Sequence, residues 1–582
     1  MKRFFFKLGI FLEIVLFIGH LYVLRNGLPI PAKDGEGREL ILLLRTYEIS
    51  LFGAEHTVDQ ILAGYDYSWA ALVFFGLFAS IITLCVPLHI KKAKIFTCGK
   101  TLMWLVCFII AYNDWGKVQQ ILLFTLFLTF LLSYLFDWNQ PKQKDTKICI
   151  VGGGISGLTA AYQLQKQGYS NITVFEKSDK VGGKCLTNIT DWKAFDLGGH
   201  EMLAGYGDLI QIAEEIATPT RTSVPPLVYD TITKKYLNFN QAASITGKYS
   251  TFEVMLAALK YLYIVGIEFN SFSQPSTGYK NVPAELCVDL EAWLKQRNLL
   301  ALSDILSFVI KAQGYGGYAD GTAAYLVKFM GFKNWFSLLV SGIGLTKKWP
   351  RVFVYGAQNF CERLAATVPD VRLNSTIQRI ERNNAETQNG IKVFLENQDN
   401  PIFFDYLIVS TPLDAPSISL KYLELTEVEK SLFDQLQTID AYTTLCEIQG
   451  LPTGVVANLP LNDLQKGEYT GFIKDFADEP VALFLSLAKP EMTGEYILDE
   501  IRKVIARIPP YYGVQPAMIK NIQQKRWRYF PHVTKEALAN GFYDKIEAIQ
   551  GQNQTFYASS ALSFENLGNC VAYTKRLITK NF

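Results

Sequence analysis

The sequence predicts an α/β fold with a nucleotide-binding βαβ unit, preceded by transmembrane helices. Three observations carry this prediction: a glycine-rich pattern at residues 147–187, apolar runs that end by residue 138, and long helical patterns between residues 236 and 345. A chain of 582 residues is long enough for several domains. The predicted parts are a membrane segment at 1–138, a nucleotide-binding domain at 145–235, 346–415 and 523–582, and an inserted α+β substrate domain at 236–345 and 416–522.

The membrane segment is predicted from four apolar runs, at residues 4–24, 69–88, 95–112 and 118–136. Each approaches the roughly 20 residues that a spanning helix needs. No small-residue cleavage site follows the first run, which favours an anchor over a signal peptide. Lys and Arg gather before the first run and after the second and fourth runs, so the positive-inside rule predicts a multi-pass protein with its nucleotide domain on the cytoplasmic side. This orientation depends on the third run, which Lys100 interrupts, and the alternative is a soluble domain with buried helices.

Composition excludes two classes of site. A net charge of +2 and a pI of about 7.9 give no indication of nucleic-acid binding. The five histidines lie far apart and the nine cysteines form no C-x-x-C pair, so we expect neither a metal site nor a disulfide framework. The 49% hydrophobic content is high for a soluble protein and is concentrated in the first 140 residues.

The glycine-rich loop G-x-G-x-x-G at residues 152–157 follows a short apolar run that predicts a buried strand. In this motif the first glycine permits a tight turn, the second lets a pyrophosphate approach the backbone, and the third allows close packing of helix on strand. The start of the next helix offers backbone N–H groups and a positive dipole to phosphates. The residues of this motif predicted to form the nucleotide site are Gly152, Gly154, Ile155, Ser156 and Gly157.

An acidic residue completes the unit. A second apolar run at residues 172–175 ends in Glu176, about 20 residues after the last glycine, where a carboxylate can accept hydrogen bonds from a ribose. Lys177 follows it and is included in the predicted site. A glycine-rich turn in an ordinary α/β domain would leave Glu176 unexplained. The pattern therefore predicts a nucleotide site.

Two motifs downstream resemble the flavin-containing amine oxidase superfamily. Residues 180–187 match its R-x-G-G-R-x-x-[S/T] pattern with both arginines replaced by lysine, and residues 196–199 match its D-x-G-G pattern. The resemblance implies FAD as cofactor and a Rossmann-like FAD-binding domain of the amine oxidase type. The superfamily has A-G-[D/E] where this chain has residues 558–560, A-S-S, so a charge that bonds the FAD linker is missing. The further positions that the resemblance implies at the cofactor are Gly183, Lys184, Gly198, Gly199, His200, Ile377 and Ser560.

Four segments, at residues 181–185, 314–325, 529–533 and 556–558, resemble the polyenoic fatty acid isomerases of that superfamily. The resemblance implies hydride transfer from a bis-allylic carbon to the flavin N5 atom and back, and therefore an apolar, dry site. It places Tyr529 and Phe530 against the isoalloxazine, and His200 is a candidate catalyst with a purely structural role as the alternative. No basic residue for a substrate carboxylate is found in residues 224–229.

Three functions are therefore compared. The first is a membrane-anchored FAD oxidoreductase or isomerase acting on a hydrophobic substrate, an unsaturated lipid or fatty acid, beside the lipid bilayer. The second is a flavin amine oxidase or carotenoid-type desaturase with net redox turnover. The third is a degenerate flavin-binding protein whose function lies in the membrane segment. Peroxide production distinguishes the second from the first, and absence of flavin indicates the third.

Overall fold

The computed structural model describes residues 28–33, 39–44, 49–51, 145–224, 226–230, 235–238, 249–315, 321–342, 350–382, 390–414, 419–459, 469–508, 510–511 and 513–582. The chain divides into two compact units, Met1–Gln140 and Pro141–Phe582. The four predicted transmembrane runs lie outside the described residues. Within the described ranges, no helix combines the length and the apolar character needed to cross a bilayer.

In the first unit the described residues form one antiparallel sheet. Strand β1 (Leu28–Lys33) pairs with β2 (Glu39–Leu44), and β2 pairs with β3 (Ile49–Leu51).

The second unit is built on a five-stranded parallel sheet with the order β12-β5-β4-β16-β22. Its central strand β4 is completely buried, as expected of a parallel strand covered on both faces. This order places the first strand of the βαβ unit in the middle of the sheet, where nucleotides bind at the carboxyl ends of the strands. The strands are β4 (Ile148–Val151), β5 (Ile172–Phe175), β12 (Asp370–Arg372), β16 (Tyr406–Val409) and β22 (Thr555–Tyr557).

Helix α5 (Ile155–Lys166) starts within the glycine-rich motif, directly after Gly154, and packs against the last helix of the chain, α20 (Leu567–Asn581). Small residues such as Ala160 and Ala161 are fully buried on α5 and allow this close approach. Helix α14 (Gly356–Ala365) also contacts α5. The βαβ unit is thus covered by helices from two distant parts of the sequence.

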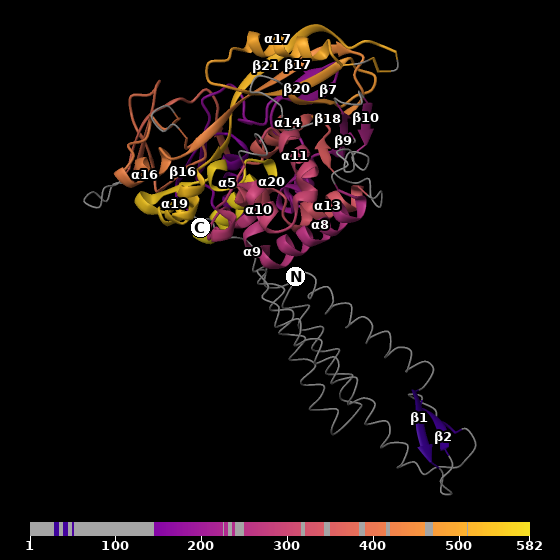
Figure 1. Cartoon of the computed structure of the whole chain (residues 1–582). Coiled ribbons are helices and arrows are strands. Elements are labelled where there is room, and N and C mark those ends of the chain that lie inside the picture. The colour runs from indigo at the N-terminus through magenta and orange to yellow at the C-terminus, as the bar shows by residue number, and fades with distance from the viewer. Residues whose placement is uncertain are drawn as a thin grey trace, which may run out of the picture. The chain divides into compact units, whose positions relative to one another are not determined.

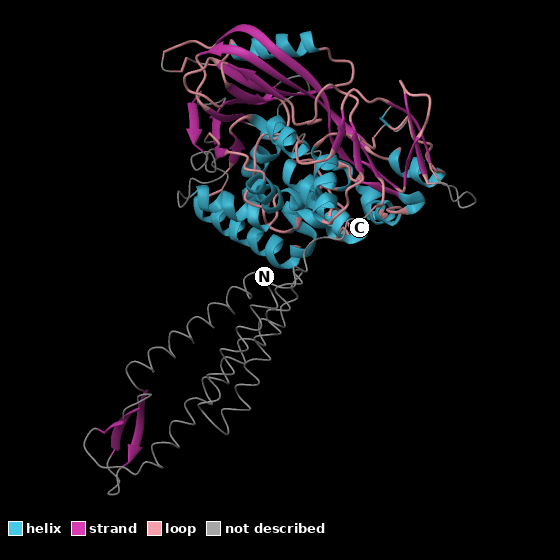
Figure 2. Cartoon of the chain, turned by 180° about the vertical axis from the view of Figure 1, so that it is seen from behind, coloured by secondary structure: helices cyan, strands magenta, loops and turns pink. Residues whose placement is uncertain are grey.

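A second, seven-stranded sheet has the order β10-β9-β18-β19-β20-β17-β21 and lies on the side of the unit opposite to most of the helices (Figures 1 and 2). Strand β9, at residues 226–230, belongs to this sheet although it lies before the domain boundary predicted at 235. Strand β21, at residues 517–532, extends over both sides of the boundary predicted at 523. The strands are β9 (Pro226–Asp230), β10 (Lys235–Asn238), β17 (Gln437–Gln449), β18 (Gly454–Leu459), β19 (Tyr469–Lys474), β20 (Val481–Ala488) and β21 (Ala517–His532).

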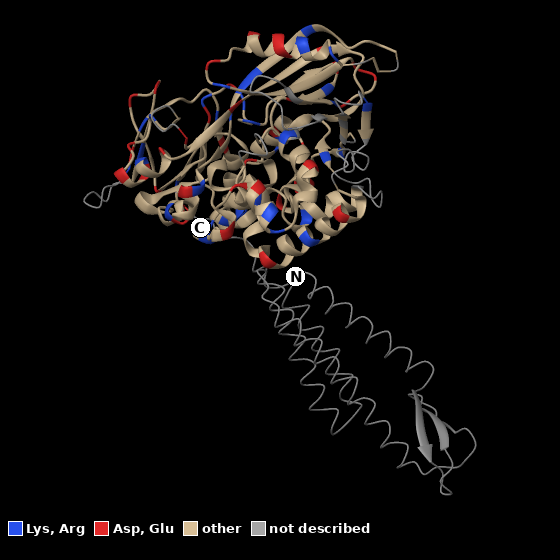
Figure 3. Cartoon of the chain, viewed as in Figure 1, with Lys and Arg blue, Asp and Glu red and all other residues tan. Residues whose placement is uncertain are grey.

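Most of the remaining helices form a layer below the two sheets in the view of Figure 1, in which lysine, arginine and acidic residues are interspersed (Figure 3). The helices are α6 (Gly207–Glu215), α8 (Thr251–Tyr263), α9 (Asn270–Ser273), α10 (Leu290–Gln296), α11 (Ser303–Ala312), α12 (Ala323–Phe329), α13 (Phe332–Gly342), α16 (Glu427–Phe433), α18 (Lys535–Ala539) and α19 (Phe542–Ala548). Helix α17 (Gly494–Ile505) lies apart from them, at the top in Figure 1, on the seven-stranded sheet. The second unit also contains three small sheets. Two of them have two strands each: β6 (Thr187–Thr190) pairs with β7 (Lys193–Asp196), and β8 (Thr220–Thr222) pairs with β11 (Arg351–Phe353). The third has three strands, β13 (Ile377–Glu381), β14 (Ile391–Leu395) and β15 (Ile402–Phe404).

Candidate FAD site

The glycine-rich loop has the backbone that its motif predicts. Gly152 has φ +104°, a left-handed conformation that side-chain-bearing residues rarely adopt. A Cβ on Gly157 would lie 2.0 Å from the carbonyl oxygen of Gly152, so this position must be glycine for α5 to start so close to β4. Ser410, at the end of β16, fixes the turn by donating to the carbonyl oxygens of Val151 (2.8 Å) and Gly152 (2.9 Å).

Gly154 differs from these two glycines because the space beside it is open. It caps α5 in an ordinary extended conformation, φ −78° and ψ 176°, and no side chain caps this helix end. A Cβ there would meet only Gly182 and Gly183, both at 4.0 Å. The N-terminus of α5, with its positive dipole, therefore has an adjacent space that suits a diphosphate.

Glu176 lies at the mouth of the same loop. Its carboxylate accepts hydrogen bonds from the backbone N–H of Gly153 (2.7 Å) and of Ser178 (2.9 Å). Each carboxylate oxygen can accept more than one hydrogen bond, so capacity remains for ribose hydroxyls. The backbone N–H of Ser375 donates to the carbonyl oxygen of Glu176, and this brings the buried Ile377 close to the same end of the site. Lys177 lies exposed in the loop that follows.

The two glycine pairs of the downstream motifs lie against one another and against the glycine-rich loop. The Gly182 N–H donates to the carbonyl oxygen of Gly153 (2.9 Å), and the Gly199 N–H donates to that of Lys184 (3.0 Å). A Cβ on Gly198 would lie 1.8 Å from the Lys184 carbonyl oxygen. Cys185, next in the chain, is buried, and its hydrogen bond with Cys361 and its burial raise the pKa of the thiol, which keeps it unreactive.

A buried carboxylate lies where the sequence lacks the acid of the A-G-[D/E] motif. Glu565 accepts hydrogen bonds from the Ser560 hydroxyl (3.2 Å) and from the backbone N–H of Phe530, and it forms an ion pair with Lys184. Lys184 also donates to the carbonyl oxygen of Arg528 (2.6 Å). One carboxylate thus joins the lysine of the V-G-G-K segment, the end of β21 and Ser560.

The N-terminal turn of α20, next to Glu565, carries polar groups without partners in the described part of the chain. Asn566 caps the helix by accepting from the Asn569 N–H (2.7 Å), but its own Nδ2 has no partner. Asn569 is fully buried and both atoms of its side-chain amide are unsatisfied. Unsatisfied buried polar atoms are destabilising, which indicates that a polar ligand completes this place. Together with the open Gly154, these amides fit a dinucleotide such as FAD.

An aromatic wall surrounds the end of β21, defined by Tyr315, Tyr325, Phe329, Tyr529, Phe530 and Phe564. Tyr315 stacks on Tyr529 with 5.3 Å between ring centroids and 12° between planes, and it meets Phe564 edge-on at 4.5 Å. The Tyr315 hydroxyl donates to the Glu565 carbonyl oxygen (2.9 Å) and the Tyr529 hydroxyl to that of Gln313 (3.2 Å). Phe530 has φ +52°, an uncommon value for a bulky residue, which its N–H bond to Glu565 helps to maintain.

The aromatic wall is uncharged. Burial raises the pKa of the tyrosine hydroxyls of Tyr315, Tyr325 and Tyr529 above their ordinary range, so all three stay protonated. His532, which stacks on Phe530 at 5.2 Å, is also buried, and burial lowers its pKa. The imidazole is therefore neutral at physiological pH.

His200 belongs to a separate, charged cluster. Its Nδ1 lies 3.2 Å from Asp196 and its Nε2 lies 3.6 Å from Asp475. Burial lowers the pKa of His200, but the two carboxylates outweigh burial and raise it to about 9. Arg221 lies 3.6 Å from the other oxygen of Asp475. Glu201, whose pKa burial raises, accepts from Ser223 (2.9 Å) and Gln313 (3.0 Å).

The predicted residues thus fall into two groups. The glycines, Glu176, Lys184 and Ser560 lie around one continuous site, and Tyr529 and Phe530 form part of the adjacent wall. No contact between His200 and either aromatic residue is found among the described residues, and its neighbour Glu201 is linked to Tyr529 through Gln313. Sequence reasoning missed Glu565, Asp475 and Arg221. Arg221 stands only 22 residues after Gly199, just before the stretch searched for a basic residue, so it could have been found.

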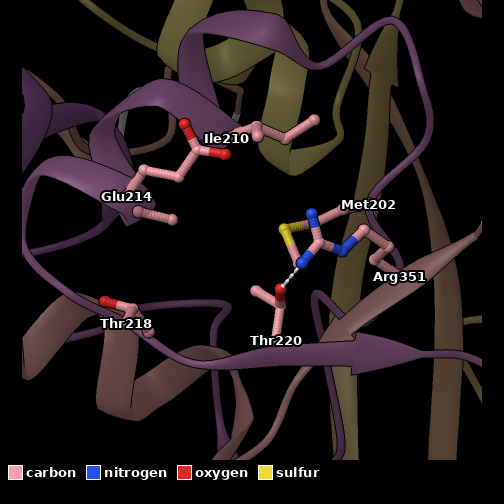
Figure 4. A pocket seen from close by; sticks show the side chains of 7 residues that line it. Met202, Ile210, Glu214, Thr218, Thr220 and Arg351 are labelled. Carbon is pink, nitrogen blue, oxygen red and sulfur yellow. Dashed lines mark hydrogen bonds between the residues drawn. The ribbon is translucent and has the colours of Figure 1, made fainter.

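A pocket of about 250 Å³, which includes its opening to solvent, lies between α6 and β8 (Figure 4). Arg351 lies at one side of it and donates to Thr220. None of the residues predicted at the cofactor lines it. The lining residues are Met202, Ile210, Ala213, Glu214, Thr218, Thr220 and Arg351. In the described parts of the chain no cluster of three or more His, Cys, Asp or Glu side chains could hold a metal ion.

Comparison with known proteins identifies similar chains. The family model described as "Flavin containing amine oxidoreductase" matches residues 155–457. The FAD-dependent oxidoreductase dpchF of Colletotrichum higginsianum is 21% identical over 453 residues, which covers 72% of this chain and 90% of that protein. The polyenoic fatty acid isomerase of Ptilota filicina is 35% identical over 77 residues, 13% of this chain and 15% of that protein. The crystal structure of the CLA-producing fatty acid isomerase from P. acnes superimposes with a TM-score of 0.65 at 22% identity, covering 75% of this chain and 99% of that one.

Proposed function

The chain belongs to the flavin-containing amine oxidoreductase family, and on that premise we propose that it is a membrane-anchored isomerase of unsaturated lipids. It is a FAD-dependent enzyme of that superfamily. The proposal adds the substrate, the redox-neutral outcome and the membrane location. The aromatic wall is the observation that carries it.

An uncharged aromatic wall suits the removal and return of hydride more than acid–base chemistry. FAD, when bound, supplies an acceptor and donor of hydride. Loss of hydride from the carbon between two double bonds leaves a delocalised cation on the substrate, and return of hydride to a different carbon gives a conjugated diene with no net redox change. The faces of Tyr315 and Tyr529 would stabilise that cation, and the buried Phe329, Phe530 and Phe564 would exclude water from it.

In this proposal the residues of the chain position the substrate and do not transfer protons to it. Glu565 holds the Phe530 backbone and, through its carbonyl oxygen, the Tyr315 hydroxyl. These bonds fix rings that come from β21, from the chain after α11 and from the turn before α20. A rigid wall keeps the reacting carbon of a flexible acyl chain near its hydride acceptor, and such positioning supplies a large part of a rate enhancement.

The His200 cluster is the proposed place for a polar end of the substrate. Arg221 and the protonated His200 are two positive charges near three carboxylates, so the cluster is not strongly basic. That balance favours a neutral polar group, such as an ester or hydroxyl, over a free carboxylate. The Ser223–Glu201–Gln313 bonds link the cluster to Tyr529 and so to the wall.

The membrane location rests on the apolar runs in the first 138 residues, and the cytoplasmic side on the distribution of Lys and Arg around them. A multi-pass anchor would keep the enzyme beside its lipid substrate. A hydrophobic small molecule and the bilayer are therefore the proposed partners, with no nucleic acid.

The test is turnover by purified, FAD-loaded full-length protein in detergent or nanodiscs. Linoleoyl lipids and free linoleate are supplied, and conjugated dienes are followed by ultraviolet absorbance while peroxide is measured in parallel. We expect dienes without stoichiometric peroxide, and more product from the esterified lipid than from the free acid. Stoichiometric peroxide or reduced acceptor would instead identify a net oxidase or desaturase. A protein that takes up no flavin would refute both enzyme functions.

A further inference from the structure

Helix α8 exposes apolar side chains on the face that points away from the core. Its buried stripe includes Val254, Ala257 and Tyr261. Its outer stripe, continued by the π-helical turn Ile264–Glu268, is also apolar, and each member is more than half exposed. This stripe consists of Phe252, Met255, Leu256, Leu259, Tyr263 and Ile267.

Helix α13 extends this surface. Phe332 and Phe336 are exposed and stack on one another, with 6.0 Å between centroids and 6° between planes. Gly266 lies against Phe332, because a Cβ at Gly266 would come within 2.6 Å of that ring. The two helices therefore form one continuous surface, which we call the α8–α13 face.

A face of this kind needs a partner. Large exposed apolar patches usually mark a contact with another protein or with a membrane. At roughly 150–250 Å² per aromatic side chain, the exposed parts of Phe252, Tyr263, Phe332 and Phe336 alone present about 300–500 Å². The four aliphatic residues add to this, so the face is at least as large as the roughly 300–600 Å² of the largest patch on a typical monomer. Lys260 on α8 and Lys333 on α13 are exposed. The Lys260 ammonium donates to the carbonyl oxygen of Arg297 (2.7 Å), so Lys333 is the cation offered to lipid headgroups.

The length of chain before this unit indicates which partner it is. The last apolar run ends at residue 136, and β4 starts at Ile148, so only eleven residues lie between them. Fully extended, they reach at most about 40 Å. If the apolar runs cross a bilayer, the second unit is confined to that distance from the lipid surface, and this surface needs an apolar counterpart.

We propose that the α8–α13 face docks on the surface of a lipid bilayer, with Phe252, Leu256, Leu259 and Phe336 inserted among the headgroups and Lys333 at the phosphates. The inference rests on the membrane location proposed above, but not on the proposed reaction. It predicts a second membrane contact, made by the catalytic unit itself.

The test places a fluorophore on each side of the unit. Leu259 on α8 and Ile519 on β21 are equally exposed, at 53% and 55%, and α8 and β21 lie on opposite sides in Figure 1. Full-length Leu259→Cys and Ile519→Cys proteins are made with Cys85, Cys98 and Cys107 changed to alanine, since the other six cysteines are buried. Each is labelled with NBD and reconstituted into phosphatidylcholine vesicles containing phosphatidylserine, with or without nitroxide-bearing lipid.

We expect the label at position 259 to be quenched by the nitroxide lipid at least threefold more than the label at 519. Equal quenching at both positions would overturn the inference. So would a label at 259 that iodide cannot reach in lipid-free detergent, because residues 1–140 or a second copy would then cover the face. Met255→Cys provides a second position if the first variant fails to bind FAD. Flotation of the vesicles reports the membrane anchor separately, so a failure of the proposed location is recognised as such.

Discussion

Substitution of alanine for Gly154 distinguishes a cofactor role from a structural one. Gly154 has φ −78°, which alanine adopts without strain, and its added Cβ would find no protein atom nearer than 4.0 Å. The free energy of unfolding of the apoprotein should therefore change by no more than about 0.5 kcal/mol. If a diphosphate passes over Gly154, the methyl group occupies its place. Overpacking of this kind costs about 1–3 kcal/mol, so FAD should bind roughly 5- to 150-fold more weakly.

The assay is a titration of the apoprotein with FAD, followed by flavin fluorescence, beside thermal unfolding of the same apoprotein. Gly157→Ala is the matched control three residues away. Its Cβ would lie 2.0 Å from the Gly152 carbonyl oxygen and 2.6 Å from the Ser410 hydroxyl. The control should therefore lower the melting temperature in the absence of any cofactor.

Two results would refute this reasoning. If Gly154→Ala binds FAD within twofold of the wild type, the diphosphate does not pass over this residue. If Gly154→Ala lowers the stability of the apoprotein as much as Gly157→Ala does, the space beside Gly154 is filled by the protein itself.

Four further predictions follow from the site and its surroundings. Glu565→Gln should lower the free energy of unfolding in urea by about 1–3 kcal/mol, because Lys184 and the Phe530 N–H lose a charged acceptor. Lys184 is a third exposed, so solvent limits the loss. An unchanged free energy of unfolding would mean that the ion pair contributes nothing to stability. The folded pKa of His200, about 9, exceeds the unfolded value of about 6.5, so its stabilisation is fully present below pH 6.5 and is lost as the pH rises through 9. Between these pH values the wild type should lose up to about 3 kcal/mol more than His200→Gln, and equal losses would contradict the assignment. Tyr529→Phe should retain turnover within about threefold, whereas Tyr529→Leu, which loses the stack on Tyr315, should lose roughly tenfold; equal effects would show that the hydroxyl matters, not the ring. Arg382→Met should cost about 3–5 kcal/mol in urea unfolding because it leaves the buried Glu429 unpaired, and the double variant with Glu429→Gln should recover part of that loss.

The βαβ unit was predictable because its signals are local. Strands Ile148–Val151 and Ile172–Phe175 have the predicted bounds, since a buried parallel strand is a short apolar run between glycines and polar residues. The helical spacing predicted at residues 158–167 corresponds to α5 (Ile155–Lys166), which starts three residues earlier, inside the G-x-G-x-x-G motif. The superfamily and FAD, predicted by resemblance, are confirmed by the family match.

The rest of the site could not be predicted because it is assembled across long separations. Lys184 and Glu565 are 381 residues apart, and no local pattern joins them. Strand β21 is buried at only two of its 16 residues and carries polar residues on both faces, so it lacks the alternation that predicts a strand. Asp475 is one acid among many until the fold brings it to His200.

The division between an uncharged wall and a charged cluster has a consequence for pH dependence. Burial keeps the wall tyrosines protonated and His532 neutral, so no group of the wall titrates in the physiological range. His200 and Glu201, whose pKa values are both raised, titrate in the neighbouring cluster, and Gln313 connects that cluster to Tyr529. A hydride transfer confined to the wall would therefore be insensitive to pH in its chemical step. If the cluster holds the polar end of the substrate, as proposed above, any pH dependence of turnover would arise there and would affect KM more than kcat.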